Sequence, residues 1–77
     1  MKIYFIPKSI KLTDAILKRL KEELLLPAQC IEQIKYWNDE YYPYSGTIVN
    51  VGADECYPYD RNIDSVKEEY PDIIVWE

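Results

Sequence analysis

Two helical patterns meet at a proline in residues 20–41, which read LKEELLLPAQCIEQIKYWNDEY. Pro27 ends the first pattern because proline disfavours the helical conformation in the residue before it. The same proline suits the first position of a second helix, where its missing N–H needs no partner. The stretch therefore predicts two consecutive helices that meet at an angle.

The first of these helices is expected to begin near Thr13, whose hydroxyl can cap it. Its apolar residues recur at the spacing of one helix face, and charged residues stand between them. The apolar residues are Ile16, Leu17, Leu20 and Leu24. This side of the helix is expected to pack against a core.

Three β-branched and aromatic runs predict strands, at residues 2–6, 47–51 and 73–76. Residues 53–61 are predicted to be a polar loop. A third helix is expected after Asn62, which can act as its N-cap. The inward residues of that helix are Ile63, Val66 and Tyr70.

The elements follow the order strand, helix, helix, strand, helix, strand in a single domain, residues 1–77. Because helices separate the strands, the sequence favours an α/β fold with a small, three-stranded, mainly parallel sheet and three helices. The near-continuous apolar character of the strands indicates that both faces of the sheet are buried.

The composition limits the class of function. The chain has 77 residues, with 14 acidic side chains against 9 basic ones, no histidine and a formal charge of −5. This balance argues against direct binding of nucleic acid, because such affinity comes mainly from Lys and Arg. No run approaches the ~20 apolar residues needed to span a membrane, and no secretory signal is recognised. A cytoplasmic location without membrane attachment is therefore expected.

Catalytic, metal and redox chemistry have little support. Without histidine, general base work needs a carboxylate or lysine in a recognisable motif, and none is present, so the chain is not expected to be an enzyme or to hold a cofactor. The loop acids Asp54, Glu55 and Asp60 lack an EF-hand spacing, so solvated side chains are favoured over a metal site. Cys30 and Cys56 lack a Cys-x-x-Cys spacing; two reduced thiols are the default, and a single bridge is the alternative.

The second helix divides into a packing side and an outer side. At ~100° per residue, the packing side gathers Cys30, Ile31, Ile34, Trp37 and Tyr41. The opposite side can be an ordinary solvated face or a binding face, on which tyrosines supply contact area and carboxylates attract a basic partner. The candidate partner-binding residues on this side and at the helix exit are Glu32, Tyr36, Asp39, Glu40, Tyr42 and Tyr44.

Residues 20–27, with a strand before them and a helix carrying Trp37 after them, resemble the barstar family of intracellular ribonuclease inhibitors. Residues 72–75 are similar to the last strand of that fold. The resemblance covers about half of the chain. It implies a three-stranded parallel sheet and an acidic helix that plugs a basic enzyme cleft. The family's Trp-Asp step on that helix corresponds either to Trp37-Asn38 or, with one residue inserted, to the neighbourhood of Asp39, which the resemblance favours as the central carboxylate. Residues 28–32 depart from the family, which has an aromatic pair, a glycine and an asparagine there, so the target does not carry over.

A second resemblance is to the phage inhibitors of uracil-DNA glycosylase, which present carboxylates in place of DNA phosphates. The similar segments follow the same order and are Leu26-Pro27, Ser45-Gly46-Thr47-Ile48-Val49 with Asp54-Glu55, and Glu69-Tyr70-Pro71. The strongest helix of this chain precedes Leu26, where that family has a strand. This resemblance therefore ranks below the first.

Together these patterns predict a small acidic protein inhibitor, a monomer when free, that blocks the basic cleft of a nuclease or other nucleic-acid enzyme by mimicking nucleic acid. Asp39 and Glu32 are expected to pair with Arg or Lys, Tyr36 to supply contact area, and Glu40 to lie at the rim. One alternative is a phage-type DNA mimic acting on uracil-DNA glycosylase or a host defence enzyme. Another is a non-inhibitory subunit with a permanent tyrosine-rich interface.

Overall fold

A computed structural model describes residues 2–76. Its elements are β1 (Lys2–Ile6), α1 (Asp14–Leu24), α2 (Ala28–Tyr41), β2 (Gly46–Val51), β3 (Glu55–Tyr59), α3 (Ile63–Glu69) and β4 (Ile74–Val75). Both predicted N-caps are confirmed, because Thr13 Oγ1 accepts a hydrogen bond from the Ile16 N–H and Asn62 Oδ1 accepts one from the Ser65 N–H. Pro27 was predicted to be the first residue of the second helix. It is instead the N-cap, and α2 begins one residue later, at Ala28.

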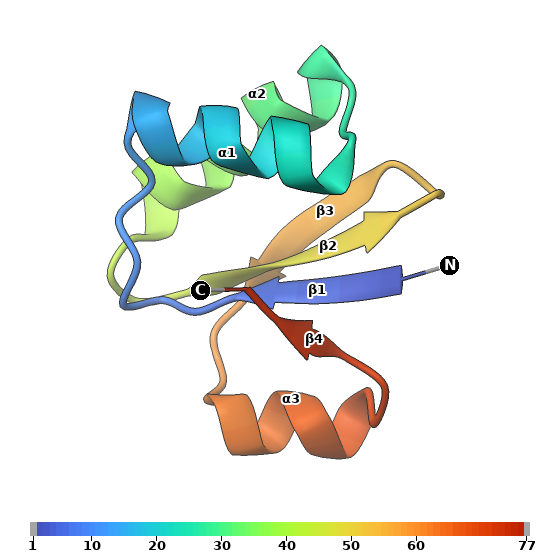
Figure 1. Cartoon of the computed structure of the whole chain (residues 1–77). Coiled ribbons are helices and arrows are strands. Elements are labelled where there is room, and N and C mark those ends of the chain that lie inside the picture. Colours follow the sequence, from blue (N-terminus) through green and yellow to red (C-terminus); the bar gives the residue numbers. More distant parts are fainter. Residues whose placement is uncertain (1, 77) are drawn as a thin grey trace.

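The sheet lies between two helical layers. α1 and α2 cover one face, and α3 lies against the other (Figure 1). Successive side chains of β1 alternate between the two cores: Tyr4 and Ile6 pack in the cluster under α1 and α2, whereas Ile3 and Phe5 pack in the cluster with α3. The predicted burial of both sheet faces is confirmed. Within residues 2–76, no helix combines the length and apolar character that crossing a membrane requires.

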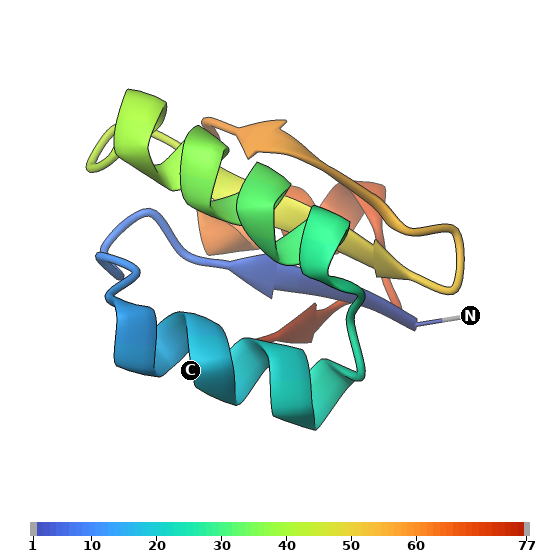
Figure 2. The same ribbon diagram turned by 90° about the horizontal axis from the view of Figure 1, so that it is seen from above.

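The sheet contains four strands in the order β3-β2-β1-β4, so the prediction of a three-stranded, mainly parallel sheet was wrong. β2 is antiparallel to both β1 and β3, and only β1 and β4 are parallel. The two consecutive helices explain the first reversal: α1 runs back along β1, and α2 returns the chain to the end where β1 finished (Figure 2). Because a single helix separates β3 from β4, these two strands run in the same direction.

β3 lies within residues 53–61, where a polar loop was predicted, and this prediction was also wrong. Gly52 and Asp54 have φ angles of 103° and 53°, which allow the chain to turn tightly between β2 and β3. Pro58 lies in β3, and a proline is tolerated there because β3 is an edge strand of the sheet.

Asn38 is a buried polar residue, only 6% exposed, that joins α2 to the connection between β1 and α1. Its Oδ1 accepts a hydrogen bond from the Leu12 N–H at 3.1 Å, and its Nδ2 donates to the Ile10 carbonyl at 3.2 Å. We expect Asn38→Ala to lower the free energy of unfolding by about 1–3 kcal/mol, because it leaves buried backbone groups without partners. Urea denaturation measures this loss. The exposed control Lys35→Ala should change it by less than about 0.5 kcal/mol, and an equally small effect at Asn38 would contradict the assigned role.

Candidate functional site

The outer side of α2 is exposed as its periodicity predicts. The side chains of Glu32, Tyr36, Asp39 and Glu40 all face solvent, and Tyr36 is 51% exposed. The opposite side of the helix packs on the sheet and on α1 through a buried set that includes Cys30 and Ile34. The predicted packing side wrongly included Tyr41 and omitted Asn38. Tyr41 is 41% exposed because it lies in the last turn of α2, and Asn38 is buried although it is polar.

The two candidate tyrosines that follow α2 differ in exposure. Tyr44 is 77% exposed and continues the surface past the end of the helix. Tyr42 is half-buried, and its backbone N–H donates to the Asn38 carbonyl at 2.8 Å to close the last turn of α2. The structure therefore leaves Tyr44 exposed beside the C-terminal end of α2, where its N–H donates to the Tyr41 carbonyl, and gives Tyr42 a smaller accessible area.

Three aromatic rings touch in a row along α2. Tyr36 meets Trp37 edge to face, with 5.0 Å between ring centroids, and Trp37 stacks on Tyr41 at 5.8 Å. These contacts restrict the exposed rings of Tyr36 and Tyr41, so a partner that binds them has less side-chain freedom to remove. We therefore add Tyr41 to the candidate surface, although the sequence periodicity had assigned it to the packing side.

We name the surface formed by these side chains the acidic-tyrosine face. Its residues are Glu32, Tyr36, Asp39, Glu40, Tyr41 and Tyr44. Within residues 2–76, its three carboxylates form no ion pair; the ion pairs there join Arg19 to Glu23 and Arg61 to Glu69. α2 itself contains one lysine, Lys35, against three acids, so the face is negative overall.

A further carboxylate lies beside this face. Asp60, just past β3, and Tyr41 line the same hollow of about 300 Å³, together with Ser45 and Pro58. The sequence predicted Asp60 only as a solvated loop acid, because the position of β3 beside α2 was not foreseen. Asp60 therefore adds a carboxylate near the C-terminal end of α2 to the three carboxylates of the acidic-tyrosine face.

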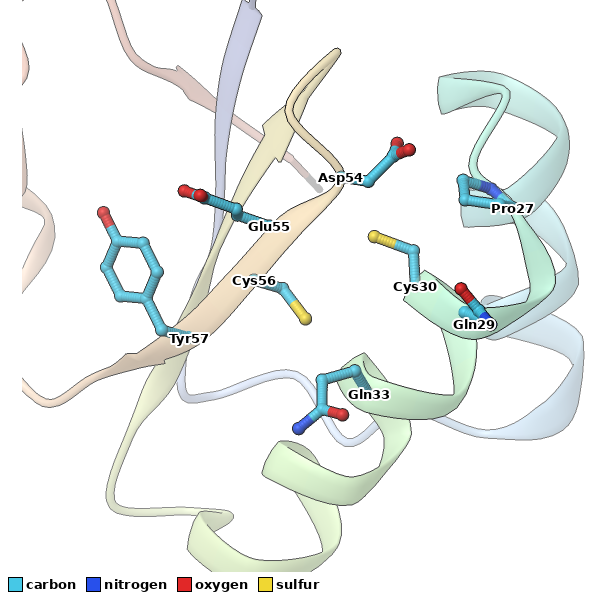
Figure 3. A pocket seen from close by; sticks show the side chains of 8 residues that line it. All are labelled: Pro27, Gln29, Cys30, Gln33, Asp54, Glu55, Cys56 and Tyr57. Atoms are coloured by element: carbon cyan, nitrogen blue, oxygen red, sulfur yellow. The ribbon is translucent and has the colours of Figure 1, made fainter.

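A larger hollow, of about 490 Å³, opens between the N-terminal half of α2 and β3. Figure 3 shows Cys30 on the helix and Cys56 on the strand, with Asp54 and Glu55 near the opening. Both thiols are free, in agreement with the default prediction. Burial raises the pKa of Cys56 to about 12 and also raises the pKa of Cys30. Among the described residues, no group of three or more Cys, Asp or Glu side chains is arranged to hold a metal ion.

Comparisons with protein-family models, with curated proteins and with solved structures find no match to this chain. The interpretation of the site therefore depends on its own geometry. Carboxylates outside any ion pair of residues 2–76, beside exposed tyrosines that pack on Trp37, can pair with cations, and the tyrosine rings can cover the apolar stems of those cations. This chemistry suits recognition of a basic protein surface.

Proposed function

We propose that this protein binds and blocks the basic cleft of a nuclease or another nucleic-acid-processing enzyme through the acidic-tyrosine face. The observation that carries the proposal is the exposure of three carboxylates, none of them in an ion pair within residues 2–76, together with exposed, ring-packed tyrosines on α2. A helix anchored in the core by Cys30, Ile34 and Asn38 presents these groups without a large rearrangement.

In the proposed complex, carboxylates of the inhibitor take the places of nucleic-acid phosphates. Asp39 and Glu32 form charge-assisted hydrogen bonds with Arg or Lys of the target, and Tyr36 and Tyr41 cover the adjacent surface. The tyrosine rings also accept an arginine guanidinium through cation–π contact. Glu40 lies at the rim and contributes mainly to long-range attraction, as does the formal charge of −5.

The resemblance to the barstar family adds support because it points to the same helix and to Asp39 as the central carboxylate. The proposal does not depend on it, since the mixed four-stranded sheet differs from the parallel sheet that the resemblance implied. The target enzyme is defined here by its chemistry alone: a cleft lined with Arg or Lys that normally holds a nucleic-acid backbone.

We expect the association rate with the target to fall at least about tenfold when the salt concentration rises from ~20 mM to ~500 mM, because salt screens the long-range attraction. The dissociation rate should change much less, since short-range contacts govern it. Stopped-flow or surface plasmon resonance measurements separate the two rates. An association rate independent of salt would contradict electrostatic steering.

The function is tested by capture followed by an activity assay. Immobilised protein is incubated with extract of its source cell, washed at low and then high salt, and the proteins released at high salt are identified and assayed. A basic nucleic-acid enzyme that the pure protein inhibits supports the proposal. Recovery of a partner that is retained at high salt and is not inhibited instead supports the permanent-subunit alternative. Self-association in sedimentation of the isolated chain also supports that alternative.

A further inference from the structure

The fold brings its two cysteines together across the contact between α2 and β3. Cys30 lies in the first turn of α2, and Cys56 lies in β3, where it pairs with Val49 of β2. In Figure 3 the Cys30 thiol points toward the strand and the Cys56 thiol toward the helix, into the same hollow. Cys56 packs against the core cluster that contains Cys30, and each thiol influences the titration of the other.

The two cysteines come from different elements and line the same hollow. One sulfur comes from a helix and the other from an edge strand, and the hollow that both residues line is open. Cys30 is only 4% exposed, whereas Cys56 is partly exposed, so Cys56 is the more accessible thiol. A small reagent can therefore enter. The helix and the strand are in direct contact, so no separate element has to move away before the sulfurs meet.

We propose that Cys30 and Cys56 form a redox-active pair, which a small-molecule disulfide converts into an intramolecular disulfide that ties α2 to β3. One cysteine thiolate attacks a sulfur of the reagent, forms a mixed disulfide and releases one small thiolate. The second cysteine loses its proton to solvent and attacks the protein sulfur of that mixed disulfide. The Cys30–Cys56 bond forms and a second small thiolate leaves. Two protein thiols are oxidised, and one reagent disulfide is reduced to two thiols.

The surroundings of the pair determine which reagent suits it. Asp54, Glu55 and Tyr57 are the titratable groups that line the hollow from the strand side, whereas Gln29 and Gln33 line it from the helix side and carry no charge. The acidic groups attract a cationic disulfide such as cystamine and repel an anionic one such as oxidised glutathione. The reaction should therefore be faster with cystamine.

The pH dependence of the reaction follows from the need for a thiolate. Burial disfavours the charged form of both cysteines, and the carboxylate of Asp54 adds to this effect at Cys30. Both thiols therefore stay protonated at neutral pH and ionise only as the pH rises. The rate should increase about tenfold per pH unit between pH 7 and pH 9.

The experiment treats the purified protein with excess cystamine at pH 8.5 and follows it by intact mass spectrometry, peptide mapping and thermal unfolding. The expected product has lost two hydrogens, contains a Cys30–Cys56 linked peptide and unfolds at a midpoint at least about 10 °C higher. Dithiothreitol should reverse both changes. Cys30→Ser should stop at a mixed disulfide on Cys56, the more exposed thiol, and show no such increase.

Three outcomes overturn the inference. Wild-type protein that accumulates two mixed disulfides has thiols that do not meet, and protein that keeps both thiols unmodified has no accessible pair. An intramolecular disulfide that lowers the unfolding midpoint would mean that the two sulfurs meet only when the native packing of α2 on β3 is disturbed. None of these outcomes bears on the acidic-tyrosine face, so this inference and the proposed function are tested independently.

Discussion

The double substitution Glu32→Ala/Asp39→Ala should weaken binding of the target enzyme by about 3–5 kcal/mol, which is a loss of 100-fold or more in Kd. In the proposed complex each carboxylate neutralises a cation of the target cleft that becomes buried on binding. Removing both leaves those cations desolvated and unpaired, which costs more than the contacts themselves. Most of the loss should appear as faster dissociation.

A matched control separates this effect from a general loss of negative charge. Glu68 is exposed on α3, on the face of the sheet opposite to α2, so Glu68→Ala removes a helical carboxylate without touching the proposed site. We expect Glu68→Ala to change Kd by less than about threefold. Calorimetric titration of each variant gives the affinities, and thermal unfolding verifies that each is folded. If the double variant binds like wild type while remaining folded, the site assignment is wrong.

Gly46→Ala should lower the free energy of unfolding by about 3 kcal/mol, because a single methyl group has no room at the start of β2. A Cβ on Gly46 would collide with the Ile6 carbonyl oxygen and come within 2.7 Å of Cε1 of Phe5. Ile6 and Phe5 belong to β1, one of the two inner strands, and are each 1% exposed, so neither can move aside without disturbing a core. A domain of this length is typically stable by ~4–11 kcal/mol, and the loss is therefore a large fraction of the total.

Urea denaturation measures this loss, and Ser9→Ala serves as the control at an exposed position shortly after β1. The free energy of unfolding of the control should stay within about 0.5 kcal/mol of the wild-type value. A Gly46→Ala protein as stable as the control would mean that β1 and β2 are not packed as closely as the structure describes.

The helices were predictable because their signals are local. Thr13 and Asn62 can cap a helix from sequence alone, and the apolar residues of α1 recur at helical spacing, so their burial followed. The exposed side of α2 was predictable for the same reason. The burial of Asn38 was not predictable, because its hydrogen-bond partners, Ile10 and Leu12, lie far away in the sequence.

The sheet was harder to predict because strand direction and edge strands depend on the whole fold. Strands separated by helices favoured parallel pairing, but α1 runs back along β1 and α2 returns the chain to the end where β1 finished. β2 therefore starts at that end and runs antiparallel to β1. The short segment Glu55–Tyr59 contains Pro58 and several polar neighbours, a composition typical of a loop. Its pairing with β2 makes it a strand, and that pairing also places Cys56 opposite Cys30 and Asp60 near Tyr41.

The central claim is that the acidic-tyrosine face occupies the site on the enzyme that otherwise holds nucleic acid. A competition titration tests this claim directly, with the captured enzyme bound to a fluorescent oligonucleotide and fluorescence anisotropy as the signal. The proposal predicts full release of the oligonucleotide at one equivalent of wild-type or Glu68→Ala protein, and little release by Glu32→Ala/Asp39→Ala. A ternary complex, in which the enzyme holds the oligonucleotide and the wild-type protein at once, would contradict it.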